Sequence, residues 1–210
     1  MSKLMDKQAA MHDFWQKHVL DRWQYDLIEI DQRYSEQKAG IENGFCQAFD
    51  ALCTQAARQQ EQGSKGEIHT IFFSFLRTSI MENSAAYRLD AHDENWFLDR
   101  TECTVAWEAD FIFAPLFRRM TELEQVKSAY ARKITSMDIE RIKQSEAIKY
   151  HLLAVEFMKS MVPMLLECPG YRQMGKSLKI CLLAGEYRDQ CEVLYAHPDP
   201  ADKETNGAGA

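Results

Sequence analysis

The sequence predicts an α+β fold that is mainly helical. Over most of the chain, apolar residues recur at the three- and four-residue steps of amphipathic helices. Two stretches, 67–99 and 176–196, instead contain short runs typical of strands, separated by turn-forming residues. An isolated β-hairpin is marginally stable, so two hairpins are expected to join each other or to pack on a helix. We therefore expect a long N-terminal helical hairpin and further helices packed with a small antiparallel sheet made from two β-hairpins.

Residues 1–62 are expected to form the helical hairpin. Residues 3–37 contain neither glycine nor proline, and their apolar side chains follow a helical repeat. Gly40 interrupts this repeat, and a second helical stripe follows from Ile41 to Ala56. A short break between two helices usually places them antiparallel, which predicts a hairpin that turns at Gly40.

The strand-rich segment 67–99 is expected to provide the first β-hairpin. Residues 68–81 fit a helical repeat, but their enrichment in Ile, Phe and Thr favours a strand, and we assign them to one. In residues 85–92, apolar and polar residues alternate, which predicts a half-buried strand with one polar face. Residues 93–95 then predict a turn.

The helical repeat returns over residues 101–167. Pro115 is expected to kink this region or to begin a new helix, and Thr135 or Ser136 can cap a further one. Ile148 and Leu152 fall on the apolar stripe of that last helix and are expected in the core.

The end of the chain is expected to contain the second β-hairpin and a tail. Two apolar runs within 176–196 flank a polar turn. Residues 198–210 lack the apolar content of a packed segment and predict a disordered tail. Residues 1–197 are expected to form a single globular domain.

Composition narrows the class of protein. The chain has 210 residues and a formal charge of −7, which argues against a nucleic-acid-binding surface spread over the molecule. The first residues show no apolar core of a signal peptide, and no run has the length of a membrane span, so we expect a cytoplasmic protein without a membrane partner. The six cysteines lack CxxC spacing and are expected to be free thiols.

The densest group of reactive side chains lies in residues 87–99. In an extended strand, Arg88, Asp90 and His92 point to the same side. A histidine with carboxylates can act in acid–base chemistry or bind a metal, but one strand supplies two ligands at most, so no metal site is predicted. The alternative is a solvated strand face whose charge pairs contribute little to stability.

A second polar group lies where the last hairpin turns. Glu186 and Arg188 are candidate ligand contacts, and the alternative is an ordinary polar turn. If the two hairpins pair, these residues are expected near Arg88, Asp90 and His92. This convergence is the condition for a site on the sheet.

Other candidates are weaker. Arg118 and Arg119 could clamp an anion, although two adjacent arginines more often belong to a helix surface. The chain has no GxGxxG, P-loop, GxSxG or HExxH pattern, so a nucleotide-binding protein, a serine hydrolase and a zinc peptidase all lack their characteristic motif. No cofactor is identified.

Two classes of function are open. The first is an interaction or assembly module that binds a copy of itself or another protein through its long helices, whose aromatic residues lie on more than one face. The second is a small-molecule- or metal-binding protein or enzyme that uses the polar face of the sheet.

Overall fold

The computed structural model describes residues 6–186 and 190–197, so Arg188 and the predicted tail lie outside the described residues. The chain divides into two compact units. Unit 1 comprises Met1–Ile41, Arg77–Ala85 and Ala109–Leu153. Unit 2 comprises Glu42–Leu76, Ala86–Glu108 and Ala154–Ala210. The single domain expected from the sequence stays a prediction.

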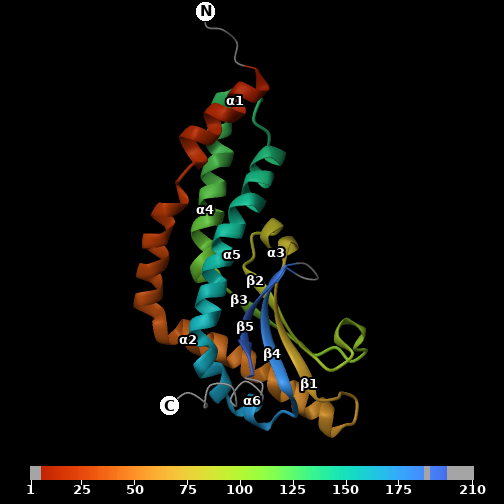
Figure 1. The fold of residues 1–210 in the computed structure, drawn as a ribbon. Coiled ribbons are helices and arrows are strands. Elements are labelled where there is room, and N and C mark those ends of the chain that lie inside the picture. The colour runs from red at the N-terminus through yellow and green to blue at the C-terminus, as the bar shows by residue number, and fades with distance from the viewer. Residues whose placement is uncertain (1–5, 187–189, 198–210) are drawn as a thin grey trace, which may run out of the picture. The chain divides into compact units, whose positions relative to one another are not determined.

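Unit 1 is helical. Its elements are α1 (Lys7–Phe14), the π-helix η1 (Trp15–Val19), the first part of α2 (Trp23–Glu61), α3 (Arg77–Met81), α4 (Asp110–Val126), the 3₁₀-helix η3 (Lys127–Tyr130) and the first part of α5 (Ser136–Glu167). Figure 1 shows α4 and α5 running beside each other, with α1 and the first part of α2 alongside. Aromatic contacts join these helices: Phe113 of α4 lies 5.9 Å from Tyr150 of α5, and Tyr34 of α2 stacks on Phe111 of α4 at 6.0 Å.

The helix starts follow local sequence signals. Asp6 caps α1 by accepting a hydrogen bond from the Ala9 backbone N–H at 2.7 Å. Thr135 caps α5 as expected: its Oγ1 accepts from the Asp138 N–H, and the Asp138 carboxylate accepts from the Thr135 N–H at 2.9 Å. This reciprocal pair is a capping box, with Asp in the position usually held by Glu.

The turn predicted at Gly40 is absent. Gly40 lies inside α2, which runs from Trp23 to Glu61 and departs from helical backbone angles only at Gln37, where φ is −119° and ψ is 16°. Residues 23–61 are therefore two helical stretches that meet at a kink at Gln37 without a loop between them, and the turn predicted at Gly40 is wrong. A lone glycine costs a helix only about 1 kcal/mol, whereas a helical hairpin needs a loop of its own. The chain instead breaks before α2, where Asp21 takes a left-handed conformation with φ of 58°.

Unit 2 contains a five-stranded mixed sheet in the order β3-β2-β1-β4-β5. The strands are β1 (Ile68–Phe75), β2 (Ala86–His92), β3 (Thr104–Glu108), β4 (Lys176–Glu186) and β5 (Cys191–Ala196). The neighbours β1–β2 and β4–β5 are antiparallel, as the two predicted hairpins require. The hairpins also join in one sheet, which confirms the predicted α+β class, but they meet through the parallel pair β1–β4. The sheet is thus mixed and larger than the two hairpins.

Two boundaries differ from those predicted. The segment 68–81 is a strand only as far as Phe75, and α3 begins at Arg77. Residues 104–108 form β3, whereas a helix was expected from residue 101. Five residues are too short for periodicity to separate a strand from a helix. Pairing with β2, which places Trp107 opposite Tyr87, decides the conformation.

Aromatic side chains form the core of unit 2 on one face of its sheet. Phe73 of β1 and Trp107 of β3 contact Phe45 of α2, with ring centroids 5.7 and 4.5 Å apart, and Phe157 of α5 stacks on Trp107 at 5.7 Å. Phe45 and Phe73 are fully buried. The helices thus cover the face that also carries Tyr87.

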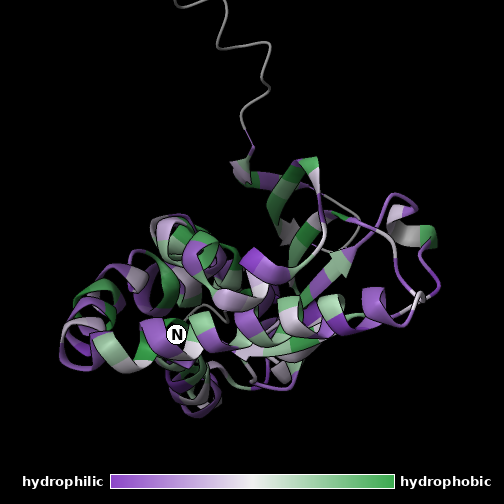
Figure 2. Cartoon of the chain, turned by 90° about the horizontal axis from the view of Figure 1, so that it is seen from below, coloured by the Kyte–Doolittle hydropathy of each residue, from purple (hydrophilic) through white to green (hydrophobic). Residues whose placement is uncertain are grey.

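The helices are amphipathic, and Figure 2 shows hydrophobic and hydrophilic residues interleaved along them. Over the part of the chain that the structure describes, no helix combines the length and the apolar composition needed to cross a bilayer.

Candidate functional site

Arg88, Asp90 and His92 share one face of β2, as predicted. Their cross-strand neighbours in β1 are Ser74, Phe72 and Thr70, respectively. This face is opposite to the one that carries Tyr87 and the aromatic core, because successive strand residues point to opposite sides.

Arg88 and Asp90 are bound to each other. The Arg88 Nε donates to both Asp90 carboxylate oxygens at 2.9 and 3.0 Å, and its Nη2 donates to Glu102 at 3.1 Å. Asp90 is buried, with 3% of its surface exposed. Both carboxylate oxygens of Asp90 therefore already accept from the arginine. The pair joins a buried carboxylate to a half-exposed guanidinium, so it matches neither an open binding site nor the solvated strand face given as the alternative.

His92 is half-buried beside this pair, with its ring 5.8 Å from that of Trp96. Burial lowers the pKa of His92, and the nearby Asp90 carboxylate offsets this only in part. The imidazole is therefore neutral near pH 7.

Of the second hairpin's two candidate residues, the structure describes Glu186, and Glu186 does not converge with Arg88, Asp90 and His92. Glu186 is aligned with Phe75, which in turn is aligned with Tyr87. Aligned residues point to the same face, so Glu186 lies on the opposite face of the sheet from Arg88. The condition that the hairpins pair is met through the parallel strands β1 and β4, but their register places Glu186 on the other face.

The polar loop after β2 is held by a contact that the sequence analysis missed. The Lys65 ammonium group is fully buried and bonds the Asp99 carboxylate at 2.5 Å and the Thr101 carbonyl oxygen at 2.8 Å. Burial raises the pKa of Asp99, but hydrogen bonds led by that from Lys65 outweigh this and hold the pKa below its usual value. The Asp99 carboxylate thus fixes the conformation of this loop through its contact with Lys65. Among residues 6–186 and 190–197, no group of three or more His, Cys, Asp or Glu side chains is arranged to hold a metal ion.

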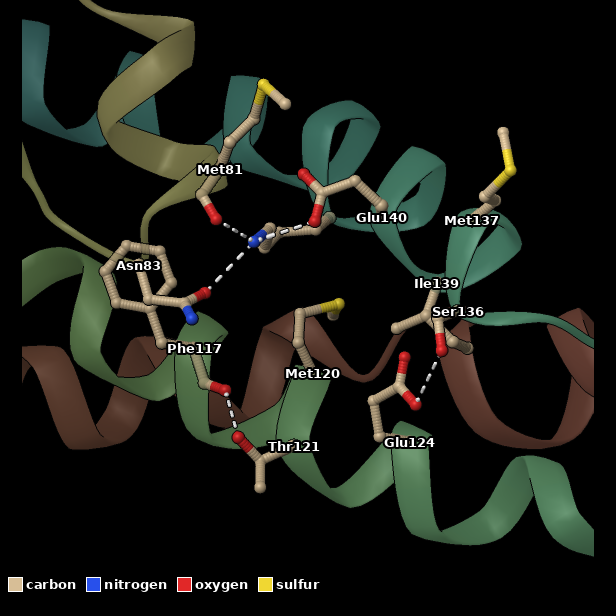
Figure 3. Close-up of a pocket in the computed structure, with 11 residues that line it drawn as sticks. Met81, Asn83, Phe117, Met120, Thr121, Glu124, Ser136, Met137, Ile139 and Glu140 are labelled. Atoms are coloured by element: carbon tan, nitrogen blue, oxygen red, sulfur yellow. Dashed lines mark hydrogen bonds and ion pairs between the residues drawn. The ribbon is translucent and has the colours of Figure 1, made fainter.

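Unit 1 contains a pocket of about 500 Å³, shown in Figure 3. Its apolar lining is Met81, Phe117, Met120, Met137 and Ile139, and its polar lining is Asn83, Thr121, Glu124, Ser136, Glu140 and Lys143. These residues come from α3 and the turn after it, α4 and α5. Met120 and Ile139 are buried, whereas Met81 and Met137 are 57% and 68% exposed. The pocket, here called the methionine groove, therefore has an apolar floor and two flexible apolar side chains at its edge.

Lys143 shapes one wall of the methionine groove. Its buried ammonium group donates to the Met81 carbonyl oxygen and to Asn83 Oδ1, both at 3.0 Å, and pairs with Glu140 at 2.9 Å (Figure 3). An ammonium group has three N–H donors, so these acceptors saturate it. Lys143 joins the end of α3 to α5 and has no N–H left for a ligand.

A stripe of exposed residues runs along α5 in unit 1. We call it the α5 stripe; it consists of Met137, Arg141, Ser145, Ile148 and Leu152. Their steps of four, four, three and four residues place them on one face of the helix. Ile148 and Leu152 are 40% and 55% exposed, so the prediction that they belong to the core is wrong. The same repeat would arise for a core or an interface stripe, and sequence alone cannot separate the two.

Comparisons with protein-family models, with curated proteins and with solved structures found no match to this chain.

Proposed function

We propose that the protein is an assembly module that associates with a second copy of itself through the α5 stripe. The observation that carries the proposal is the exposure of three large apolar side chains, Met137, Ile148 and Leu152, on one face of a helix. Single exposed apolar residues are ordinary, but three of them on one face of a helix are more typical of an interface.

The α5 stripe is self-complementary in the antiparallel direction. A two-fold axis between Gln144 and Ser145 would place Met137 opposite Leu152 of the second copy, since both residues lie equally far from the axis. The same axis would place Arg141 opposite Ile148 of the second copy, where the aliphatic part of the arginine can cover the isoleucine. A symmetric dimer requires such a pattern, in which each patch contacts its own image.

The small side chain of Ser145 lies next to that axis, where two helices approach most closely. Arg141 is 75% exposed and contacts Asp138 of its own helix only at 4.0 Å, so its side chain can move to a second copy. Met137 also borders the methionine groove, so Leu152 of the second copy would lie at the mouth of that groove.

A contact through one helix of each copy is small, because the stripe from Met137 to Leu152 extends only about 22 Å. Interfaces of this size belong to weak, reversible associations. We therefore expect a concentration-dependent equilibrium between monomer and dimer. All six cysteines are free thiols, which supports the proposal that the protein works in a reducing compartment such as the cytoplasm.

Light scattering coupled to size-exclusion chromatography over a range of protein concentrations tests this proposal. The wild-type mass is expected to rise from that of a monomer towards twice that value. Leu152→Glu places a carboxylate against Met137 at each end of the symmetric contact and is expected to leave a monomer at every concentration.

Ile28→Glu is the matched control, because Ile28 is an equally apolar residue on α2 of unit 1 and is 70% exposed. This variant is expected to dimerise like the wild type. A wild-type monomer at all concentrations, or equal loss of the dimer in both variants, would contradict the proposal.

A further inference from the structure

Arg119 is buried, although the sequence suggested a surface pair with Arg118. Only 7% of its surface is exposed. Its Nη2 donates to the Tyr150 hydroxyl at 3.0 Å and to Glu146 at 3.4 Å. Tyr150 in turn donates to the Asp26 carboxylate in a short hydrogen bond. Burial, followed by the hydrogen bond to Asp26, raises the pKa of Tyr150, so its hydroxyl stays protonated.

Two nitrogens of Arg119 lack acceptors. Within the described chain, neither Nε nor Nη1 has a hydrogen-bond partner, although both are buried. Nη1 lies 3.3 Å from Asp26 Oδ2, close enough for an ion pair but without the geometry of a hydrogen bond. Leaving a buried N–H without an acceptor costs about 1–3 kcal/mol, and more where the group is charged. Such a group therefore indicates a missing acceptor, which could be water or a ligand.

Arg119 lines a second pocket of unit 1, with a volume of about 270 Å³. The other lining residues are His18, Arg22, Tyr25, Asp26, Arg118, Glu122, Leu123 and Val126. A volume of this size corresponds to roughly nine water molecules and falls just under the usual range for small-molecule sites. A small ion with its remaining water fits, whereas a nucleotide does not.

Guanidinium groups outnumber carboxylates in the lining of this pocket. Three guanidinium groups and two carboxylates line it. Of the carboxylates, Asp26 is already engaged by Tyr150 and Arg119. Among the described residues, Arg22 forms no ion pair, and its guanidinium donates to the Lys17 carbonyl oxygen at 3.0 Å. Its positive charge is therefore not neutralised by a carboxylate of the described chain.

The second rim arginine is held by a salt bridge. Arg118 binds both carboxylate oxygens of Glu29, at 2.8 Å and 2.5 Å. The salt bridge with Glu29 holds the Arg118 guanidinium at the pocket and orients its N–H donors. It also offsets the positive charge of Arg118, which limits the affinity for an anion. The other rim arginine, Arg22, directly follows Asp21, whose backbone is left-handed. This conformation sets the direction of the chain at Arg22, in the turn before α2.

We infer that this pocket binds a small oxyanion, a phosphate or a carboxylate, with Arg119 as the buried donor and Arg22 and Arg118 as the rim. Arginine suits this role because its planar N–H groups match the oxygens of both anions. The pocket and the α5 stripe have no residue in common. Anion binding can therefore be tested independently of self-association.

Calorimetric titration of the full chain with inorganic phosphate, at constant ionic strength set by chloride, measures this binding. Titration with acetate in parallel distinguishes a phosphate site from a carboxylate site. We expect saturable binding of at least one of these anions. Arg22→Gln and Arg118→Gln are each expected to weaken it about tenfold, the effect of losing one charge-assisted hydrogen bond.

Arg100→Gln provides the charge-matched control, because Arg100 is exposed and does not line the pocket. Its affinity for the anion is expected to equal that of the wild type. Circular dichroism of each variant checks that the fold is kept, and both rim arginines are exposed enough to be replaced without unfolding the chain. Absence of saturable binding up to roughly 10 mM of either anion would overturn the inference and leave water as the partner of Arg119. An equal loss of affinity in Arg100→Gln would also overturn it.

Discussion

The two units bury different kinds of side chain. In unit 2, the centre is aromatic, with Phe45, Phe73 and Trp107 in contact. In unit 1, charged groups lie inside the helical layer: Arg119 and Glu146 are 7% and 1% exposed. Unit 2 gains stability chiefly from apolar area removed from water. Unit 1 depends in addition on the mutual neutralisation of its buried charges.

This difference implies opposite responses to substitution. An apolar core loses stability in proportion to the volume removed. A buried ionic cluster loses stability when one member is removed and recovers when the whole cluster is made neutral. The substitutions below test that contrast, from the largest expected effect to the smallest.

Phe73→Ala in unit 2 should reduce the free energy of unfolding by about 3–5 kcal/mol, because it removes a fully buried ring between α2 and the sheet. Urea denaturation monitored by circular dichroism measures the loss. Phe73→Leu, which keeps most of the volume, should cost clearly less. A similar loss in both variants would show that the ring's volume is not what stabilises this core.

Arg119→Met should reduce the free energy of unfolding by about 3 kcal/mol, because buried Asp26 loses its cation and buried Glu146 keeps only its contact with the half-exposed Lys149. Adding Asp26→Asn and Glu146→Gln should restore most of this stability. The same urea experiment measures both steps. Further loss in the triple variant would contradict the description of unit 1 as a balanced charge cluster.

Lys65→Met should cost about 2 kcal/mol, because it removes charge-assisted hydrogen bonds to Asp99 and Thr101. A double-mutant cycle with Asp99→Asn measures the coupling between the two side chains. Strong coupling would show that the buried Lys65–Asp99 pair stabilises the loop after β2. Purely additive effects would argue against the buried pair.

The smallest expected effect is the pH dependence due to His92. Because burial lowers its pKa in the folded state, the unfolded chain takes up a proton first as the pH falls. Stability should therefore decrease as the pH drops below about 6.5, the usual pKa of histidine. In His92→Gln, thermal melts between pH 7 and 5 should show a shallower decrease. An unchanged slope would mean that His92 does not titrate differently on unfolding.

The features that depend on short-range sequence patterns were predicted correctly. The α+β class, the cap at Thr135 and the alternation of residues 85–92 all follow from local spacing, and each is present. The strand β3 and the continuous helix through Gly40 were missed, because pairing and packing override a weak local signal. Local propensity cannot reveal a partner strand.

The sites were less predictable than the fold. Arg88, Asp90 and His92 share a face because strands alternate, but the alignment of Glu186 with Phe75 depends on a register that the sequence does not display. Ile148 was predicted to be buried and Arg119 to be exposed, and the structure shows the reverse for both. A helical repeat indicates that residues share a face, and only tertiary structure shows what that face contacts.

Disulfide crosslinking on the proposed two-fold axis tests the central claim most directly. The background variant is Cys191→Ser, which removes the exposed native thiol. Adding Ser145→Cys places one thiol of each copy next to the axis, whereas adding Ser35→Cys places a thiol at an exposed position on α2. Mild oxidation at a protein concentration at which light scattering detects the dimer should give a covalent dimer with Ser145→Cys and little with Ser35→Cys. Equal crosslinking of the two variants, or none with Ser145→Cys, would contradict self-association through the α5 stripe.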